Sequence, residues 1–190
     1  MSAALLAKYK LGKGVTLNMI TNTATDFVGS DGSSRSLSGA LDRSLLLHLR
    51  KQADIVITDA ATAARECYKP SALVNIEIWS KRGDFRDLEA SHAEGDKKAF
   101  MLTSPIDLTK RLSELRTLHP RVLLETGPNV TSQLGQKGQI DSICLTVADC
   151  NDLSAAREAA AEFCKTLLLT NFHVAAIDLI DGFAFMQLHR

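Results

Sequence analysis

Two segments decide the fold of this chain: VTLNMITNTATDFVGSDGSSRSLSG (residues 15–39) and ADIVITDAATAA (residues 53–64). Each contains a run of apolar, largely β-branched residues, which is typical of a buried strand. The first run passes into a loop rich in Gly, Ser and Asp, and the second ends in a turn that carries a Thr. Between them, leucines recur at helical spacing over Leu41–Leu49, which predicts a helix with one buried face.

This helix is expected to begin after Ser38, because a Ser at that position can cap the first free amides of a helix. Its leucine face predicts packing against a sheet, with Arg43, Arg50 and Lys51 on the solvent side. The resulting order of strand, loop, helix and strand is the one that a nucleotide-binding α/β domain needs. In such domains, ligands bind where loops leave the carboxyl ends of parallel strands.

The rest of the chain continues the alternation of strands and helices. Further strands are expected at 74–79, 99–103, 122–125 and 142–148, and helices at 107–118, 128–138 and 153–168. In the strand at 74–79, the alternation predicts that Asn75 and Glu77 lie on an exposed face. Asp181-Gly182 lies between two apolar runs and indicates a closing hairpin. The sequence therefore predicts one α/β domain over residues 1–190, with a mostly parallel sheet and a C-terminal antiparallel hairpin.

Composition narrows the class of partner. The chain has 22 basic and 22 acidic residues and no net charge, which does not favour nucleic acid or an anionic membrane. No apolar run is long enough to span a membrane, so none is expected to do so. The four cysteines show no CxxC spacing and the five histidines no ligand spacing, so we assign no disulfide and no metal. We expect a cytoplasmic protein that binds a small molecule.

Two turns at strand ends are candidates for phosphate binding. Glu125–Asn129 follows a strand and opens a helix, where backbone amides and the helix dipole favour a diphosphate. A tight structural turn would also use its Gly-Pro pair. Thr58–Thr62 occupies the same kind of position, and Thr62 either caps a helix or donates its hydroxyl to a phosphate. Both interpretations remain open for each turn.

Two further loops carry polar groups. Ser80–Arg82 directly follows a strand, and two cations with a hydroxyl suit the 2′-phosphate that distinguishes NADP from NAD. The alternative is a solvated, charged loop. Asp31–Ser36 is rich in donors, as a phosphate or a sugar requires, but an ordinary turn has the same composition.

In combination, these segments resemble the reductase domain of riboflavin biosynthesis. The strand at 15–20, the DGSS loop and the Leu/Arg helix are similar to its first unit, and ADIVITDAATAA to its small-residue turn before a Thr. VLLETGPNVTSQLGQKGQIDSICLTVA (122–148) resembles its Val-Leu-Val-Glu-Gly-Gly-Pro segment and the strand that follows. The resemblance covers nearly the whole chain. It implies a dihydrofolate-reductase-like three-layer fold, a homodimer, and reduction of a phosphoribosylamino-pyrimidine with NADPH.

The resemblance also implies roles for individual residues. Asn18, Ser33 and Ser34 would contact the substrate, and Glu125 and Asp26 are the acids expected to donate a proton or to orient the substrate. The residues expected to bind the cofactor are Thr58, Asp59, Ala60, Thr62, Ser80, Lys81, Arg82, Thr126, Gly127, Pro128, Asn129 and Val130.

Three departures from the family pattern bear on function. The family's Ser-Leu-Asp-Gly-Lys/Arg corresponds to residues 22–26, where Asp26 replaces a cation, and Thr126 replaces the first Gly of a Gly-Gly pair. Where the family has an Arg for the substrate phosphate, this chain reads AARECYKP (63–70), with Lys69 as the expected cation. The hypothesis is an NADPH-dependent reductase of a small heterocyclic or phosphoribosyl-type substrate. The alternative is a catalytically silent nucleotide-binding or interaction paralogue.

Overall fold

The structure is a computed structural model that describes residues 3–85, 88 and 100–190. These residues form an eight-stranded sheet in the order β4-β3-β2-β5-β1-β6-β8-β7. The strands from β4 to β6 in this order pair in parallel, and β8 and β7 pair antiparallel at the other edge. The strands are β1 (Gly14–Asn22), β2 (Ile55–Asp59), β3 (Asn75–Trp79), β4 (Met101–Thr103), β5 (Arg121–Leu124), β6 (Ser142–Ala148), β7 (His173–Ile180) and β8 (Phe183–His189).

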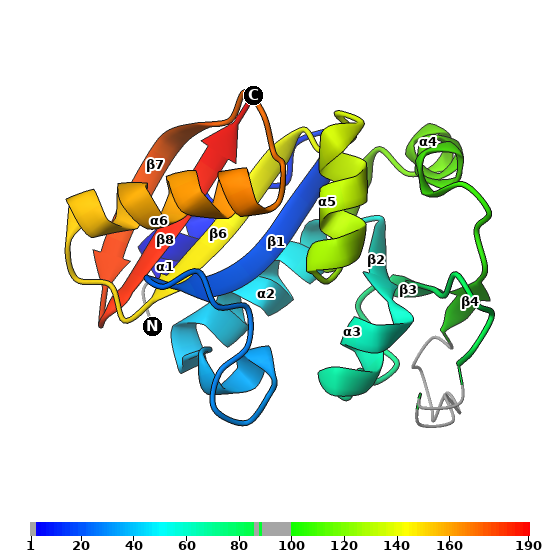
Figure 1. The fold of residues 1–190 in the computed structure, drawn as a ribbon, viewed down its shortest axis with the longest axis horizontal. Helices are drawn as coiled ribbons and strands as arrows, with labels where there is room; N and C mark the ends of the chain where they lie inside the picture. Colours follow the sequence, from blue (N-terminus) through cyan, green and yellow to red (C-terminus); the bar gives the residue numbers. More distant parts are fainter. Residues whose placement is uncertain (1–2, 86–87, 89–99) are drawn as a thin grey trace.

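Helices cover both faces of this sheet, which gives three layers (Figure 1). One face is covered by α4, α5 and α6, and the other by α1, α2 and α3. Their bounds are α1 (Ala3–Lys8), α2 (Ala40–Gln52), α3 (Ala60–Arg65), α4 (Leu108–Leu118), α5 (Pro128–Gln136) and α6 (Leu153–Thr166), with a 3₁₀ turn at Ser34–Ser36. The predicted α/β architecture, with its mostly parallel sheet, is confirmed.

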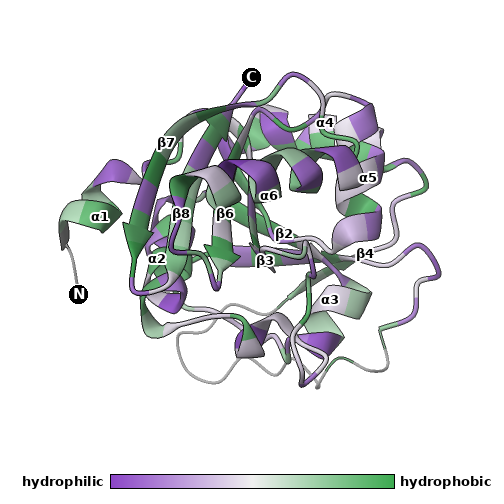
Figure 2. Cartoon of the chain, turned by 60° about the vertical axis from the view of Figure 1, so that its left-hand side comes forward, coloured by the Kyte–Doolittle hydropathy of each residue, from purple (hydrophilic) through white to green (hydrophobic). Residues whose placement is uncertain are grey.

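Each side of the sheet has its own apolar core. Leu112, Leu134 and Phe163 pack on one face, and Leu45 and Leu49 pack on the other. Parallel strands are buried on both faces, which is why runs such as Ile55–Ile57 are apolar without alternation. In Figure 2 the strands are mainly hydrophobic, and the helices carry hydrophobic and hydrophilic residues, as expected of helices that pack on a sheet.

The closing hairpin is also confirmed. Asp181 and Gly182 join β7 to β8, and both have positive φ values, 51° and 82°. Positive φ at both central residues is the geometry of a type I′ turn, whose twist matches that of the flanking strands. The Asp-Gly pair therefore identified this turn for a physical reason.

Two local predictions, both of helix caps, were wrong. The N-cap of α2 is Gly39, and the Ser38 hydroxyl instead donates to the Asp42 carboxylate at 2.6 Å. The N-cap of α3 is Asp59, so Thr62 lies within the helix that it was expected to begin. The strand expected at 99–103 is confirmed as β4, which begins at Met101, and Ala99 lies outside the described residues.

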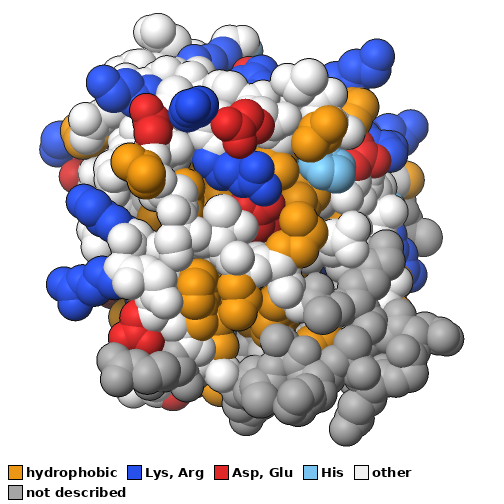
Figure 3. Space-filling view, turned by 90° about the vertical axis from the view of Figure 1, so that its right-hand side faces the viewer, with side chains coloured by type: hydrophobic (Ala, Val, Ile, Leu, Met, Phe, Trp, Pro, Cys, Tyr) orange, Lys and Arg blue, Asp and Glu red, His pale blue; other side chains and the backbone are white. Residues whose placement is uncertain are grey.

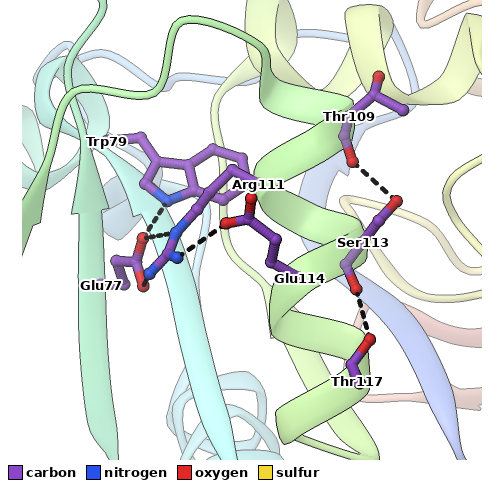
Figure 4. A network of polar contacts seen from close by, with 7 residues as sticks. All are labelled: Glu77, Trp79, Thr109, Arg111, Ser113, Glu114 and Thr117. Atoms are coloured by element: carbon purple, nitrogen blue, oxygen red, sulfur yellow. Dashed lines mark hydrogen bonds and ion pairs between the residues drawn. The ribbon is translucent and has the colours of Figure 1, made fainter.

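Glu77, predicted on an exposed face, is completely buried. Its carboxylate accepts hydrogen bonds from the Trp79 indole at 2.8 Å and from the Arg111 guanidinium at 2.9 Å on each oxygen (Figure 4). Strand alternation failed here because β3 pairs with β2 and β4 and has helices over it. A buried carboxylate is tolerated because its charge is compensated and its oxygens accept hydrogen bonds.

Removing one member of this pair should cost more than removing both. Arg111→Met leaves Glu77 charged and buried, so we expect the free energy of unfolding to fall by about 3–5 kcal/mol. The double variant Glu77→Met/Arg111→Met should lose clearly less, because it leaves no uncompensated charge. Urea unfolding of the three proteins measures both values. Equal losses in the single and double variants would contradict this account.

The edge at β4 presents apolar side chains beside charged ones (Figure 3). Met101 and Leu102 on this strand are exposed. The strand β4 has only three residues. A short edge strand limits pairing with another chain. Among the described residues, no helix is long and apolar enough to cross a membrane.

Candidate functional site

A cavity of about 370 Å³ lies at the carboxyl ends of the parallel strands, between α2 and α3. The parallel register of β1, β5 and β2 brings the ends of these strands to one edge of the sheet. The wall of the cavity is formed by β1, the loop after it, α2, α3 with the segment that follows, and the turn after β5. This is the location that the fold class predicts for a ligand.

Glu125 directly follows β5, is buried in this wall, and forms a cluster with two other side chains, Arg50 and Tyr68. The Arg50 guanidinium donates to both carboxylate oxygens, with distances of 2.9 and 2.5 Å. The Tyr68 hydroxyl donates to the same carboxylate at 2.6 Å, and the guanidinium lies 5.0 Å from the centre of the Tyr68 ring. Glu125 therefore lines the cavity as predicted, but as an acceptor that fixes two neighbours.

The protonation of this cluster follows from its burial. Burial raises the pKa of Tyr68 well above its ordinary value, and the nearby Glu125 carboxylate raises it further. Burial alone would lower the pKa of Arg50, but the Glu125 carboxylate outweighs it and the net shift is upward. The cluster is therefore an ion pair with a neutral phenol. Such an arrangement orients a ligand better than it exchanges protons with one.

Asp42 and Glu66 are the other acids that line the cavity, and the pKa of Asp42 is shifted. Asp42 lies in the first turn of α2, where its carboxylate accepts hydrogen bonds from the Ser38 hydroxyl and from Thr146. Burial raises the pKa of Asp42 above its ordinary value, despite these bonds and the nearby Arg43. Asp42 consequently retains its proton to a higher pH than an exposed aspartate does, and it can serve as a proton donor.

Four cationic side chains also reach the cavity: Arg35, Arg43, Arg65 and Lys69. Within residues 3–85, 88 and 100–190, none of the four forms an ion pair. All four are exposed in part at the cavity rim, whereas Arg50 is committed to Glu125. Unpaired guanidinium and ammonium groups around one cavity favour an anionic ligand.

The two turns predicted to bind phosphate, Thr58–Thr62 and Thr126–Val130, lie side by side and are joined by Asp59. The Asp59 carboxylate accepts a hydrogen bond from the Gly127 amide at 2.6 Å. It also accepts bonds from the Thr62 amide at 3.0 Å and the Thr62 hydroxyl at 2.9 Å. We refer to Thr58–Thr62 and Thr126–Val130 below as the paired turns.

The paired turns do not fit the diphosphate of the NADPH that the resemblance implies. A Cβ built on Gly127 would lie 2.6 Å from the Thr62 hydroxyl oxygen and 3.3 Å from the Asp59 carboxylate. The space in front of this glycine is therefore filled by the chain's own side chains. A second anion at the same amide would also meet the negative charge of Asp59.

The other predicted residues have varied positions. Asn18, Ser34, Thr62 and Thr126 to Pro128 line the cavity, whereas Asp26 does not. Asp26 is exposed and bonded to Asn22 in the turn after β1. Three of the other predicted residues do not line the cavity and bond elsewhere: Ser33 to Asp31, Thr58 to the Glu125 carbonyl, and Ser80 to the Asp84 amide. The remaining residues outside the cavity wall are Ala60, Asn129, Val130, and the exposed Lys81 and Arg82.

Sequence reasoning missed Asp42, Arg50, Arg65 and Tyr68. Arg50 was expected on the solvent side of α2, but its side chain is only 14% exposed. The available signal was the spacing of Asp42, Leu46 and Arg50, which puts two charged groups on one stripe of the helix. Lys69, the cation expected in segment 63–70, lines the cavity together with Arg65.

Comparison with known proteins identifies the fold. No family model matches the chain, and no curated protein sequence matches it. A pyrimidine reductase-like protein from Corynebacterium diphtheriae has a similar structure, with a TM-score of 0.67 at 19% identity, over 93% of this chain and 91% of that one. The dihydrofolate reductase from Enterococcus faecalis, complexed with NADP(H), gives a TM-score of 0.60 at 7% identity, over 96% and 99% of the two chains. The chain has the dihydrofolate-reductase-like fold.

This reductase fold also occurs in a diaminohydroxyphosphoribosylaminopyrimidine deaminase/5-amino-6-(5-phosphoribosylamino)uracil reductase from Thermotoga maritima. The TM-score is 0.65 at 14% identity. The match covers 94% of this chain but only 56% of that protein, so this chain spans little more than half of its length. The predicted three-layer fold and its resemblance to pyrimidine reductases are confirmed at the level of structure.

The raised pKa of Asp42 predicts a specific pH dependence of stability. The folded state binds this proton more tightly than the unfolded state, so the stabilisation is complete at low pH and is lost as pH rises through the folded pKa. Between about pH 4 and pH 7, wild-type protein should therefore lose stability relative to Asp42→Asn. Urea unfolding at both pH values measures this, with Asp181→Asn in the exposed β7–β8 turn as control. The same Asp42→Asn effect at both pH values would rule it out.

Proposed function

We propose that the cavity binds a small anionic molecule of the heterocyclic or phosphoribosyl type. The observation that carries this proposal is the set of four cationic side chains at one cavity: Arg35, Arg43, Arg65 and Lys69. A volume of about 370 Å³ suits a small ligand, and pockets of a few hundred Å³ are the usual size for one. Glu125, held by Arg50 and Tyr68, would orient the ring of the ligand.

The first use of this cavity is reduction of the bound molecule. In support, the T. maritima protein with this fold is a reductase of a phosphoribosylamino-pyrimidine, and the E. faecalis dihydrofolate reductase is complexed with NADP(H). The resemblance implies NADPH as the hydride source, and the poor fit of its diphosphate to the paired turns counts against this use. Asp42 would supply the proton, because it lines the cavity and its pKa is raised by burial.

The second use is binding without reduction, as in a catalytically silent paralogue. A specific observation favours it: Asp59 already accepts the Gly127 amide on which a cofactor diphosphate would depend. Fold alone is weak support for an activity, because one fold supports many functions. Four points stay predictions: the homodimer, the cytoplasmic location, the lack of a nucleic-acid partner, and the role of Lys81 and Arg82 in binding a 2′-phosphate.

Anion binding is tested by comparing two ligands that differ only in a phosphate. Uridine monophosphate should bind at least about tenfold more tightly than uridine, since one or two charge-assisted hydrogen bonds are worth that much. Arg65→Ala/Lys69→Ala should remove most of this difference. Isothermal titration calorimetry measures it, with Arg157→Ala on α6, which is exposed and away from the cavity, as matched control. Equal affinity for both ligands in wild-type protein would reject the anionic site.

Turnover separates the two uses. Oxidation of NADPH, followed by absorbance with a panel of pyrimidines and pteridines, should stay at background if the protein only binds its ligand. Sustained turnover that Asp42→Asn lowers by about tenfold or more would instead establish the reductase with Asp42 as proton donor. The uridine monophosphate titration of the same samples shows that the cavity is intact.

A further inference from the structure

Asp59 is the link between the paired turns, and it is held there by both of them. One carboxylate oxygen accepts from the Gly127 amide and the Thr62 hydroxyl, and the other from the Thr62 amide. The 2.6 Å distance to Gly127 is short, as expected when the acceptor carries a full charge. Three donors fix this carboxylate, so it is a built part of the turns.

The position of Asp59 matters because the Gly127 amide is at the start of α5. Amides at a helix N-terminus point outward and carry a partial positive charge, so they bind anions. Here that amide already has an anionic partner, supplied by the chain. A diphosphate at the same place would have to displace Asp59 or accept a negative charge within contact distance.

Among the described residues, no cation forms an ion pair with the Asp59 carboxylate. The Thr126 side chain is buried and bonded to the Thr131 hydroxyl at 2.9 Å, so it is turned into the core. Lys81 and Arg82, expected to meet the adenosine end of a cofactor, are exposed and do not line the cavity. The cations that do line it lie on α2, on the loop before it, and on α3 with the segment after it.

We propose that Asp59 is a specificity-determining residue: its carboxylate takes the place of a ligand phosphate between the paired turns and excludes nicotinamide dinucleotides. The cavity beside the turns stays available to a small anionic ligand. Asp59 also remains compatible with the fold, because it serves as the N-cap of α3. This inference goes beyond the proposed binding of a small anion, which does not depend on it, and it opposes the use of the cavity for reduction with NADPH.

The test measures NADPH binding directly, without turnover. Wild-type protein should bind NADPH weakly, with no saturation at high micromolar concentration. Asp59→Gly removes the carboxylate and should bind NADPH at least tenfold more tightly. Asp59→Asn removes the charge but keeps an oxygen that can accept the Thr62 amide, so it should fold as the wild type does and show a smaller gain. Fluorescence titration with NADPH measures all three.

A matched control separates the effect of charge from the loss of a helix cap. Asp152→Gly removes the same kind of N-cap from α6, away from the paired turns, and should gain no NADPH binding. The inference would be overturned if neither Asp59 variant bound NADPH more tightly than the wild-type protein does. Uridine monophosphate titration of the same proteins reports separately on the cavity, so its failure would count against the proposed function alone.

Discussion

Parallel pairing of β2, β5 and β1 is the constraint on which the rest of this structure depends. It buries most of β2 and β5 and residues 15–17 of β1, and these segments are largely apolar. It also brings the carboxyl ends of the strands to one edge, where the chain leaves the sheet. Polar side chains that the strands exclude therefore collect at that edge, and Asp59 and Glu125 follow directly after apolar runs for this reason.

Glu125 and Asp59, at the ends of neighbouring strands, are held in different ways. Glu125 is paired with a cation from α2, so the ion pair ties that helix to the end of β5. Asp59 is held by amides and a hydroxyl, and in the part of the chain that the structure describes it forms no ion pair. Among the described residues, Arg50 is the only cation of the cavity that forms an ion pair. The other four cations, Arg35, Arg43, Arg65 and Lys69, therefore give the cavity a positive character. The paired turns beside it carry the opposite charge. A positive cavity next to an acidic turn suits a small anion better than a dinucleotide, which needs both regions to accept phosphate.

The sequence predicted the architecture well because most of it depends on local rules. Apolar runs bounded by turns, leucine spacing and the Asp181-Gly182 turn each favour one local structure. The failures lie where tertiary contacts decide. The alternation around Glu77 indicates exposure, but Arg111 arrives from a helix more than thirty residues later and buries the carboxylate. In the sequence, nothing distinguishes Arg50 from an arginine on the protein surface. Only the fold brings it into contact with Glu125, at the end of β5. Likewise, the turn Thr58–Thr62 was recognised as a strand end, yet only the structure shows that its own acid reaches Gly127.

Asp59 also explains how a fold and a ligand preference can separate at one position. An aspartate is among the best N-cap residues, and capping is worth about 1 kcal/mol, so α3 gains stability from it. The same carboxylate lies against the start of α5, where it changes which anion that helix can accept. Selection for stability at position 59 and selection for a dinucleotide therefore act in opposite directions. The core, built from apolar strands and the helices packed on them, is indifferent to the choice, because Asp59 lies at the end of β2 outside both apolar clusters. Similar overall structure at 19% identity or less is consequently compatible with different chemistry at this edge.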